Sequence, residues 1–377
     1  MPWKEISLMS QRLEFITMVL KPGTNMTQLC KQYNISRRTG YKWLHRFAEG
    51  DIYGLEDRCR CPLHSPNKTP HKTEQAVLAI RQLHPYWGGR KIKARLSHQG
   101  YKFVPAASTI TAILRRNGLL DEAEAIKHTP FKRFEYDQPN QLWQMDFKGY
   151  FSISSGHCYP LTILDDHSRF SIGIRACTNE KRSTVKNQLT QVFRTYGLPE
   201  RFLVDNGSPW GSRDDFKYTK LTAWLICLGV DIIHSRPYHP QTMGKDERFH
   251  RTLKVEVLNN HVFDTIDDVQ KRFDKWRYIY NLERPHEALD MDVPASRYEP
   301  SKRMYPETLP DIEYGPDNYV RKVQYKGEIY FKGKVFKVGK AFVKYPVAVR
   351  PTTNDGIFNV FFCHKKIKQI DLRNPWK

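Results

Sequence analysis

The chain has 377 residues, and at roughly 150 residues per domain this length predicts two or three domains. Its 40% hydrophobic and 27% charged residues exclude a disordered or fibrous chain. No apolar run is long enough for a membrane span or a signal peptide, and seven cysteines, an odd number, favour a reducing compartment. We therefore expect no membrane partner and a location in the cytoplasm or nucleoid.

The net charge of +21 is concentrated at the two ends of the chain. Residues 1–120 carry 20 Lys and Arg against 7 Asp and Glu, residues 121–314 carry 27 against 29, and residues 315–377 carry 14 against 4. This division predicts terminal modules that bind a polyanion around a near-neutral centre. The alternative, in which the basic flanks only aid solubility, stays open.

Residues 1–56 have the pattern of a helix-turn-helix domain. Apolar residues at helical spacing predict a first helix, a short helix follows over residues 27–33, and Ser36 is a good N-cap for a third. Gly40 lies in this third helix where an apolar residue would normally pack. A helical hairpin with solvated arginines is the alternative interpretation. The residues expected to reach the DNA major groove are Arg37, Arg38 and Lys42.

Residues 69–120 predict a second helix-turn-helix domain. Three helices are expected over residues 73–83, 88–99 and 109–117, with Ser108 as the N-cap of the last. Two tandem modules bind a longer DNA site than one module does. The residues expected to contact DNA here are Arg90, Lys91, Arg115 and Arg116.

Residues 138–300 predict a mixed α/β domain of β-β-β-α-β-α-β order, in which helices cover a sheet. Three antiparallel strands joined by tight turns open it, and two further helices close it. The expected strands are 142–151, 157–164, 170–174, 201–205 and 230–233, and the expected helices are 183–196, 216–228, 243–258 and 266–280.

Residues 315–377 contain six short strands separated by glycine-containing turns. Strands this short and this closely spaced predict a small β-barrel, with a surface rich in lysine.

Three acids stand where the predicted sheet can bring them together. Asp146 lies within the first strand, Asp205 ends the fourth, and Glu247 lies near the start of a helix. Each alone has an ordinary explanation, because aspartates cap turns and helix glutamates face solvent. Together they offer hard oxygen ligands for one or two Mg²⁺ ions, which promote in-line phosphoryl displacement.

Around these acids the chain resembles the DDE transposases of bacterial insertion sequences, which have a retroviral-integrase-like (rve) catalytic core. The likeness covers almost the whole chain and implies a ribonuclease-H-like fold. Four motifs occur in order and at suitable spacing. These motifs are residues 143–146, 164–170, 204–208 and 239–254, and a further match at residues 280–289 is followed by Pro294 and Tyr298.

The resemblance implies that Asp146, Asp205 and Glu247 bind two Mg²⁺ ions, with Mn²⁺ as a substitute. Arg251 and Lys254 follow Glu247 by four and seven residues and therefore share its helix face. They can hold the scissile DNA end, or Arg251 can form a salt bridge to Glu247. The other expected DNA contacts of the core are Lys245, Arg248, Arg284 and His286.

Two positions depart from the family pattern. Relatives most often have Asn or Gln at the position of Met243 and a small apolar residue at that of Asp246. The added charge beside Glu247 can either aid metal binding or repel phosphate. Asp165 and Asp166 are interpreted as turn residues rather than ligands.

The expected function is that of a transposase, active in the bacterial cytoplasm at the nucleoid. It would bind the inverted-repeat ends of its element, free a 3′-hydroxyl by hydrolysis, and join it to target DNA. The expected partners are double-stranded DNA and further copies of the chain, as a dimer or tetramer in a synaptic complex. A domesticated, catalytically silent DNA-binding regulator is the alternative. A sequence-independent nuclease is disfavoured, because it needs no tandem helix-turn-helix modules.

Overall fold

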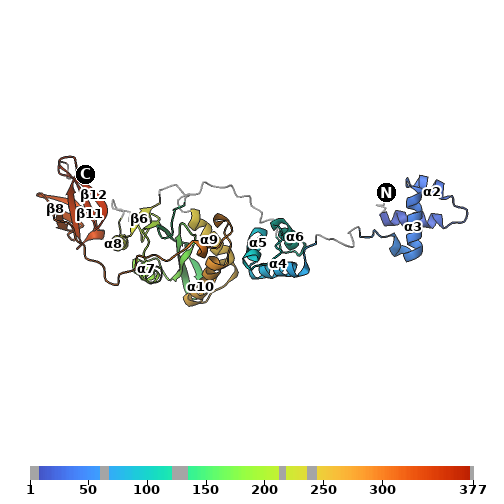
Figure 1. Ribbon diagram of the computed structural model, residues 1–377, viewed down its shortest axis with the longest axis horizontal. Helices are drawn as coiled ribbons and strands as arrows, with labels where there is room; N and C mark the ends of the chain where they lie inside the picture. Colours follow the sequence, from blue (N-terminus) through green and yellow to red (C-terminus); the bar gives the residue numbers. More distant parts are fainter. Residues whose placement is uncertain (1–7, 60–67, 121–134, 212–217, 236–243, 374–377) are drawn as a thin grey trace. The chain divides into compact units, whose positions relative to one another are not determined.

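The computed structural model describes residues 8–59, 68–120, 135–211, 218–235 and 244–373 (Figure 1). The chain divides into two compact units, Met1–Lys68 (unit 1) and Thr69–Lys377 (unit 2). Within the described ranges, no helix combines the length and the apolar character that crossing a membrane requires.

Unit 1 is a small helical domain. Its elements are α1 (Leu8–Val19), α2 (Met26–Gln32), α3 (Arg37–Gly50) and the 3₁₀ helix η1 (Asp51–Leu55). The Ser36 hydroxyl accepts a hydrogen bond from the backbone N–H of Thr39 at 3.1 Å, which confirms the predicted N-cap of α3. The core residues are Phe15, Ile16, Leu29, Cys30, Trp43 and Leu55.

Gly40 is buried where α3 crosses the other helices of unit 1. A Cβ atom at this position would lie 2.6 Å from Cys30 Sγ and 3.1 Å from the Phe15 ring. The close approach of the helices therefore explains the glycine, although glycine in a helix costs about 1 kcal/mol relative to alanine.

Unit 2 begins with three helices, α4 (His71–Leu83), α5 (Gly89–His98) and α6 (Ala107–Arg116), which enclose their own apolar core. The predicted N-cap at Ser108 is wrong, because α6 already begins at Ala107 and has no side-chain cap at Ala106. Alanine is the strongest helix former, so the helix extends toward its N-terminus past the serine.

The central sheet of unit 2 is mixed. Strand β3 pairs antiparallel with both β1 and β4, as the predicted meander requires, whereas β5 pairs parallel with β1 and with β6. The predicted first strand is interrupted after β1, and β2 pairs only with β3. The strands are β1 (Leu142–Phe147), β2 (Phe151–Ile153), β3 (Gly156–Asp165), β4 (Ser171–Cys177), β5 (Arg201–Val204) and β6 (Asp231–His234).

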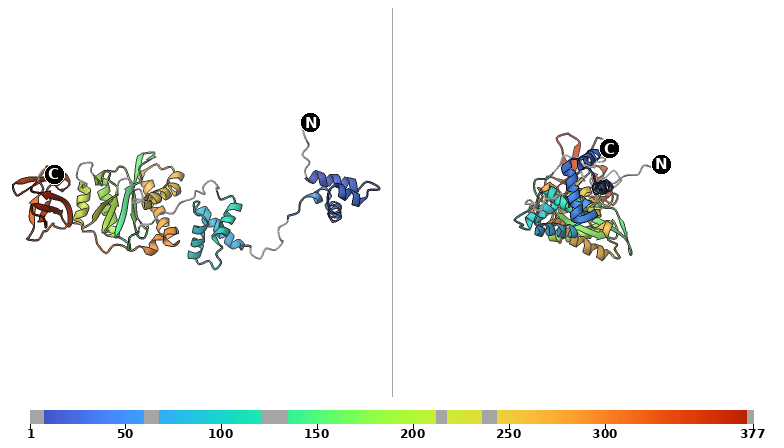
Figure 2. Two further views of the ribbon diagram at one scale, coloured as in Figure 1. Left: turned by 90° about the horizontal axis from the view of Figure 1, so that it is seen from above. Right: turned by 90° about the vertical axis from the view of Figure 1, so that its right-hand side faces the viewer.

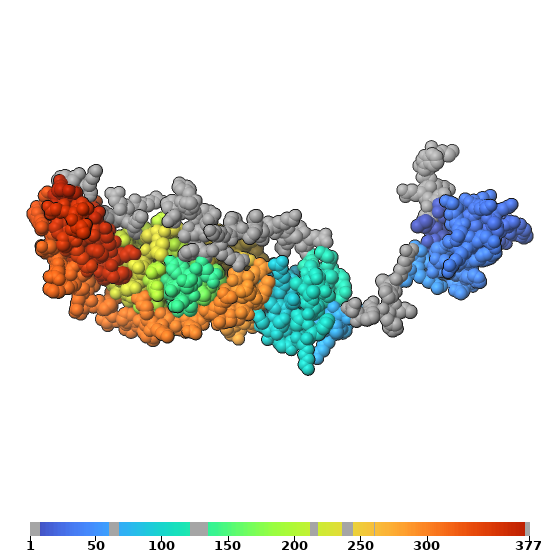
Figure 3. All heavy atoms as spheres, turned by 45° about the horizontal axis from the view of Figure 1, so that its top comes forward, coloured from blue at the N-terminus to red at the C-terminus, as the bar shows by residue number. Residues whose placement is uncertain are grey.

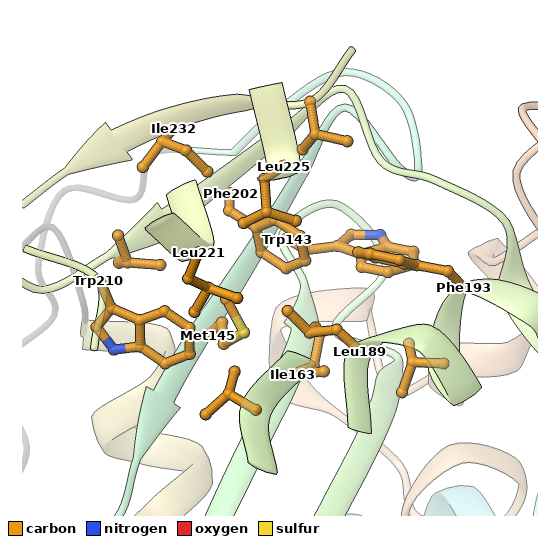
Figure 4. Packing of buried hydrophobic residues seen from close by; sticks show 14 of the residues in the cluster. Trp143, Met145, Ile163, Leu189, Phe193, Phe202, Trp210, Leu221, Leu225 and Ile232 are labelled. Carbon is orange, nitrogen blue, oxygen red and sulfur yellow. The ribbon is translucent and has the colours of Figure 1, made fainter. Parts of the chain in front are cut away.

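Helices cover both faces of this sheet (Figure 2). On one face, Trp143 and Met145 of β1 pack with Leu189 and Phe193 of α7 (Arg182–Tyr196) and Leu221 of α8 (Lys220–Cys227), as Figure 4 shows. The other face packs on α9 (Gly244–Glu256) and α10 (Ile266–Leu282). Because successive strand residues point to opposite faces, Gln144 and Asp146, which alternate with Trp143 and Met145 along β1, point toward the face that α9 covers.

After α10 the chain is mostly irregular up to residue 318. The short 3₁₀ helix η4 (Leu258–Asn260) precedes α10, and η5 (Glu287–Leu289) and η6 (Pro294–Arg297) follow it. Residues 298–318 then follow the surface of the core as an extended segment, drawn in orange in Figure 3, to the last strands. Arg303 fixes this segment by donating hydrogen bonds to the carbonyls of Pro199 and Gly229.

The last strands do not close into the predicted barrel. Among the described residues they form a four-stranded sheet of order β12-β11-β10-β7 and a separate hairpin of β8 and β9. The turn η7 (Lys340–Phe342) carries the chain inward after β9, so β10 pairs with β7 instead. The strands are β7 (Tyr319–Lys322), β8 (Glu328–Phe331), β9 (Lys334–Lys337), β10 (Pro346–Pro351), β11 (Ile357–Phe362) and β12 (Lys365–Asp371).

Residues 315–377 are called the C-terminal β-domain below. Its core includes Ala223, Ile226 and Cys227 of α8, so the domain packs on the central α/β domain. Lys365 Nζ also lies 2.9 Å from the carboxylate of Asp231 at the start of β6.

Candidate active site

Asp146 and Asp205 lie on neighbouring parallel strands. The register pairs Trp143 with Phe202 and Gln144 with Leu203. Continued by two residues, the same register sets Asp146 beside Asp205, which directly follows β5. Since neighbouring strands are about 4.8 Å apart, the two carboxylates meet at one edge of the sheet.

Glu247 lies in the first turn of α9, on the sheet face that Asp146 also faces. Phe249 and Leu253 are buried against the sheet, whereas Glu247 is exposed. The helix is tied to β1 by His250, whose Nε2 lies 2.7 Å from the hydroxyl of Thr162. That hydroxyl in turn lies 3.1 Å from the backbone carbonyl oxygen of Asp146.

The charges of Asp205 and Glu247 act on the carboxyl group of Asp146. Burial, and then the neighbouring carboxylate of Asp205, raise the pKa of Asp146 to about 7, with smaller contributions from Glu180 and Glu247. Burial also raises the pKa of Asp205, although the backbone N–H of Gly207 opposes this shift by a hydrogen bond. Carboxylates that repel one another in this way favour either a proton or a cation between them.

The donor set fits a divalent cation. Within the described ranges, Asp205 Oδ1 is buried and has no hydrogen-bond partner, and a Cβ atom at residue 207 would lie 2.8 Å from Asp205 Oδ2. Carboxylate oxygens are the ligands that Mg²⁺ prefers. Within the described ranges, no three His, Cys, Asp or Glu side chains form a closed set around one point. Asp146, Asp205 and Glu247 therefore do not form a closed ligand set.

The paired acids lie at the turn that ends β3, as predicted, with Asp165 as the last residue of the strand and Asp166 as the first residue of the turn. Asp165 accepts hydrogen bonds from the N–H and hydroxyl of Ser168 and from the N–H of Asn140. Asp166 is fully buried and pairs with Lys245, an ion pair that sequence reasoning missed. The signal in the sequence that could have indicated this ion pair is the pair of adjacent acids, Asp165 and Asp166, in a short turn.

Asp246 is the unexpected feature of the site. Its side chain is buried, at 1% exposure, and neither carboxylate oxygen has a hydrogen-bond partner among the described residues. Burial, followed by the charges of Asp146 and Asp166, raises its pKa well above the ordinary value.

The residues predicted to contact DNA fall into two groups. Those with exposed side chains occur on four helices: Arg37, Arg38 and Lys42 on α3, Arg90 on α5, Arg115 and Arg116 on α6, and Arg248, Arg251 and Lys254 on α9. Arg116 also pairs with Glu74 at 2.6 Å. The exposed side chain of Arg90 on α5 lies 3.3 Å from Glu287.

The second group points inward. Lys245 pairs with Asp166, and Arg284 pairs with the half-buried Glu256 at 3.2 Å. Burial and the charge of Arg284 lower the pKa of Lys91 to about 8 and that of His286 well below its ordinary range. The motif residues 239–243, including Met243, lie outside the described residues.

Comparison with known protein families gives matches along most of the chain. Homeodomain-like domains match residues 8–56 and 39–114, and an integrase core domain matches residues 136–240 and, with a second model, 228–294. The C-terminal domain of the IS481 family transposases matches residues 318–375. These matches give the chain the domain set of insertion-sequence transposases with an integrase core. The transposase thus combines helix-turn-helix modules with an integrase-like mixed α/β core, as predicted.

Relatives of the transposase occur in other insertion elements. An uncharacterized 31.7 kDa protein of insertion element IS407 from Burkholderia multivorans is 26% identical over 285 residues, which cover 72% of this chain and 93% of that protein. An uncharacterized 39.2 kDa protein of IS476 from Xanthomonas euvesicatoria is 29% identical over 42% of this chain and 44% of that protein.

Two solved structures are also similar to the transposase. The simian T-cell lymphotropic virus intasome in complex with PP2A regulatory subunit B56 gamma matches 78% of this chain and 99% of that chain, at 15% identity and a TM-score of 0.38. The HTLV-2 integrase catalytic core domain in complex with magnesium matches 43% of this chain and 97% of that chain, at 12% identity and a TM-score of 0.32.

Proposed function

We propose that this transposase binds the inverted-repeat ends of its mobile element, hydrolyses a phosphodiester to free a 3′-hydroxyl, and directs that hydroxyl onto target DNA. The observation that supports this most directly is the meeting of Asp146 and Asp205 on parallel strands, below the helix that carries Glu247. Three acids on separate elements of an integrase core are suited to phosphoryl transfer without a covalent protein–DNA intermediate.

Asp146, Asp205 and Glu247 are the proposed ligands of two Mg²⁺ ions, for which Mn²⁺ is the expected substitute. When bound, two such ions stabilise the attacking and the leaving oxygen of an in-line displacement. The sheet edge holds the two aspartates, and the exposed glutamate completes the ligand set from α9. Arg251 and Lys254, on the exposed face of the same helix, hold phosphates of the scissile strand.

We propose four modules: the helix-turn-helix domains 1–56 and 69–120, the catalytic domain 138–300 and the C-terminal β-domain 315–377. The helix-turn-helix domains select the element ends through the exposed arginines of α3 and α6. The C-terminal β-domain, with 14 Lys and Arg against 4 Asp and Glu, adds affinity for DNA of any sequence. Two or four copies bring the paired ends together.

The proposal is tested with Asp146→Asn, Asp205→Asn and Glu247→Gln in the full chain. Each variant is expected to lose strand cleavage and strand transfer while binding to element ends stays within about twofold, because the recognition helices are far along the chain from the acids. Asp267→Asn, an exposed acid in the first turn of α10, is the matched control and keeps wild-type cleavage. Wild-type cleavage by any of the three variants in Mg²⁺ contradicts the assignment.

A further inference from the structure

Asp166 is a buried carboxylate whose partners come from three separate segments. Its Oδ1 accepts a hydrogen bond from Gln144 Nε2 at 2.8 Å and pairs with Lys245 Nζ. Its Oδ2 accepts from the backbone N–H of Tyr136 at 2.9 Å, and its own N–H donates to the carbonyl of Leu142. The side chain is 1% exposed. Both oxygens are therefore engaged inside the protein.

Two of these partners each lie two residues before a proposed catalytic acid. Gln144 lies two residues before Asp146 on the same face of β1, since side chains two apart on a strand share a face. Lys245 lies two residues before Glu247 in the first turn of α9. One carboxylate thus joins the strand that carries the first acid to the helix that carries the third.

A second connection lies on the other side of Glu247. His250, three residues after it, contacts the Thr162 hydroxyl, which contacts the backbone carbonyl oxygen of Asp146. The glutamate is therefore flanked along α9 by two anchors that both lead to β1. Of the two, only the anchor through Asp166 is ionic, and it lies at the N-terminal end of the helix.

We propose that Asp166 is a positioning residue for the metal-binding acids: through Lys245 and Gln144 it fixes Glu247 at the distance from Asp146 that a shared cation requires. This inference rests on the proposed function of the three acids. Groups that orient metal ligands matter because a displacement of about 1 Å disrupts the coordination geometry. Replacing such a group typically weakens metal binding or activity by about 10–100-fold.

The test uses the full chain with Asp166→Asn and the matched control Asp165→Asn. Both residues are buried in the same turn, but the Asp165 carboxylate contacts only Ser168 and Asn140 among the described residues. We expect Asp166→Asn to weaken Mn²⁺ binding, measured by calorimetric titration without DNA, by about 10–100-fold. The Mg²⁺ concentration for half-maximal cleavage should rise in the same variant. Asp165→Asn should change neither the Mn²⁺ affinity nor this Mg²⁺ concentration by more than about twofold.

A loss of folding in Asp166→Asn is separated from a loss of positioning by the double variant Asp166→Asn/Lys245→Met. Removing both charges leaves neither member of this ion pair without its partner, so the melting temperature recovers toward the wild-type value. Because the anchor is still absent, Mn²⁺ binding stays at least about tenfold weak. Wild-type Mn²⁺ affinity in this folded double variant would overturn the inference.

Asp146→Asn shows which of the two proposals fails. If this variant keeps both Mn²⁺ binding and cleavage, the assignment of the three acids is wrong. If it loses both while the Asp166 variants behave like Asp165→Asn, the assignment stands and the positioning role alone is wrong.

Discussion

Replacing Asp246 with valine should stabilise the transposase. The carboxyl group is 1% exposed, both of its oxygens lack a hydrogen-bond partner in the described part of the chain, and the charges that act on it include the carboxylates of Asp146 and Asp166. A buried polar group without partners costs about 1–3 kcal/mol. At about 2 °C per kcal/mol for a unit of this size, Asp246→Val should raise the melting temperature by about 2–6 °C.

The pH dependence gives a second measure of the same effect. Because burial raises the pKa of Asp246 in the folded chain, the folded state binds a proton that the unfolded state releases above about pH 4. Wild-type stability therefore falls as the pH rises from about 4 toward the folded-state pKa. Asp246→Val lacks this contribution, so its advantage in melting temperature should be larger at pH 8 than at pH 4.5.

The assay is thermal unfolding in the presence of EDTA, so that no cation occupies the neighbouring acids. Asp246→Asn is the matched control, because it removes the charge but keeps an unpaired amide, and its gain should be smaller than that of valine. A lower melting temperature for Asp246→Val at both pH values would refute the reasoning, since the carboxylate would then have a stabilising partner.

Three further predictions follow from other sites. Gly40→Ala should lower the stability of unit 1 by about 1–3 kcal/mol, because a Cβ atom has no room there; a stabilised variant in thermal unfolding would contradict this. Since burial beside Asp205 raises the pKa of Asp146 to about 7, Mn²⁺ affinity in the absence of DNA should fall from pH 8 to pH 6, and a pH-independent calorimetric titration would be inconsistent with that. Deleting residues 315–377 should uncover α8, lower the melting temperature, and reduce the slope of log K against log salt by about 0.9 for each DNA phosphate that the domain neutralises. A lower melting temperature with an unchanged slope would leave the C-terminal β-domain only a packing role.

The order of elements in the central domain could be predicted because each strand and helix has its own hydrophobic period. The N-cap at Ser36 could also be predicted, because its hydroxyl accepts from a backbone N–H only three residues away. The parallel pairing of β1 with β5 follows from the strand–helix–strand order, so the meeting of Asp146 and Asp205 was accessible from sequence.

Interactions between distant side chains were not accessible in this way. Asp166 binds Gln144 across 22 residues and Lys245 across 79, and no local pattern specifies either pair. The inward position of Arg284 likewise depends on Glu256, 28 residues earlier. The barrel failed as a prediction because strand length and spacing do not determine which strands pair, and the inward turn at η7 decided the pairing.

The separation of unit 1 from the rest of the chain has a consequence during synthesis. Unit 1 ends at Lys68, whereas Glu247 is added roughly 180 residues later, which takes about 10–40 s at bacterial translation rates of about 5–20 residues per second. Because unit 1 has its own core, it can fold while the third acid is still untranslated. Each new molecule is therefore expected to bind DNA through unit 1 while it is still attached to the ribosome, before the catalytic domain is complete and able to cleave DNA.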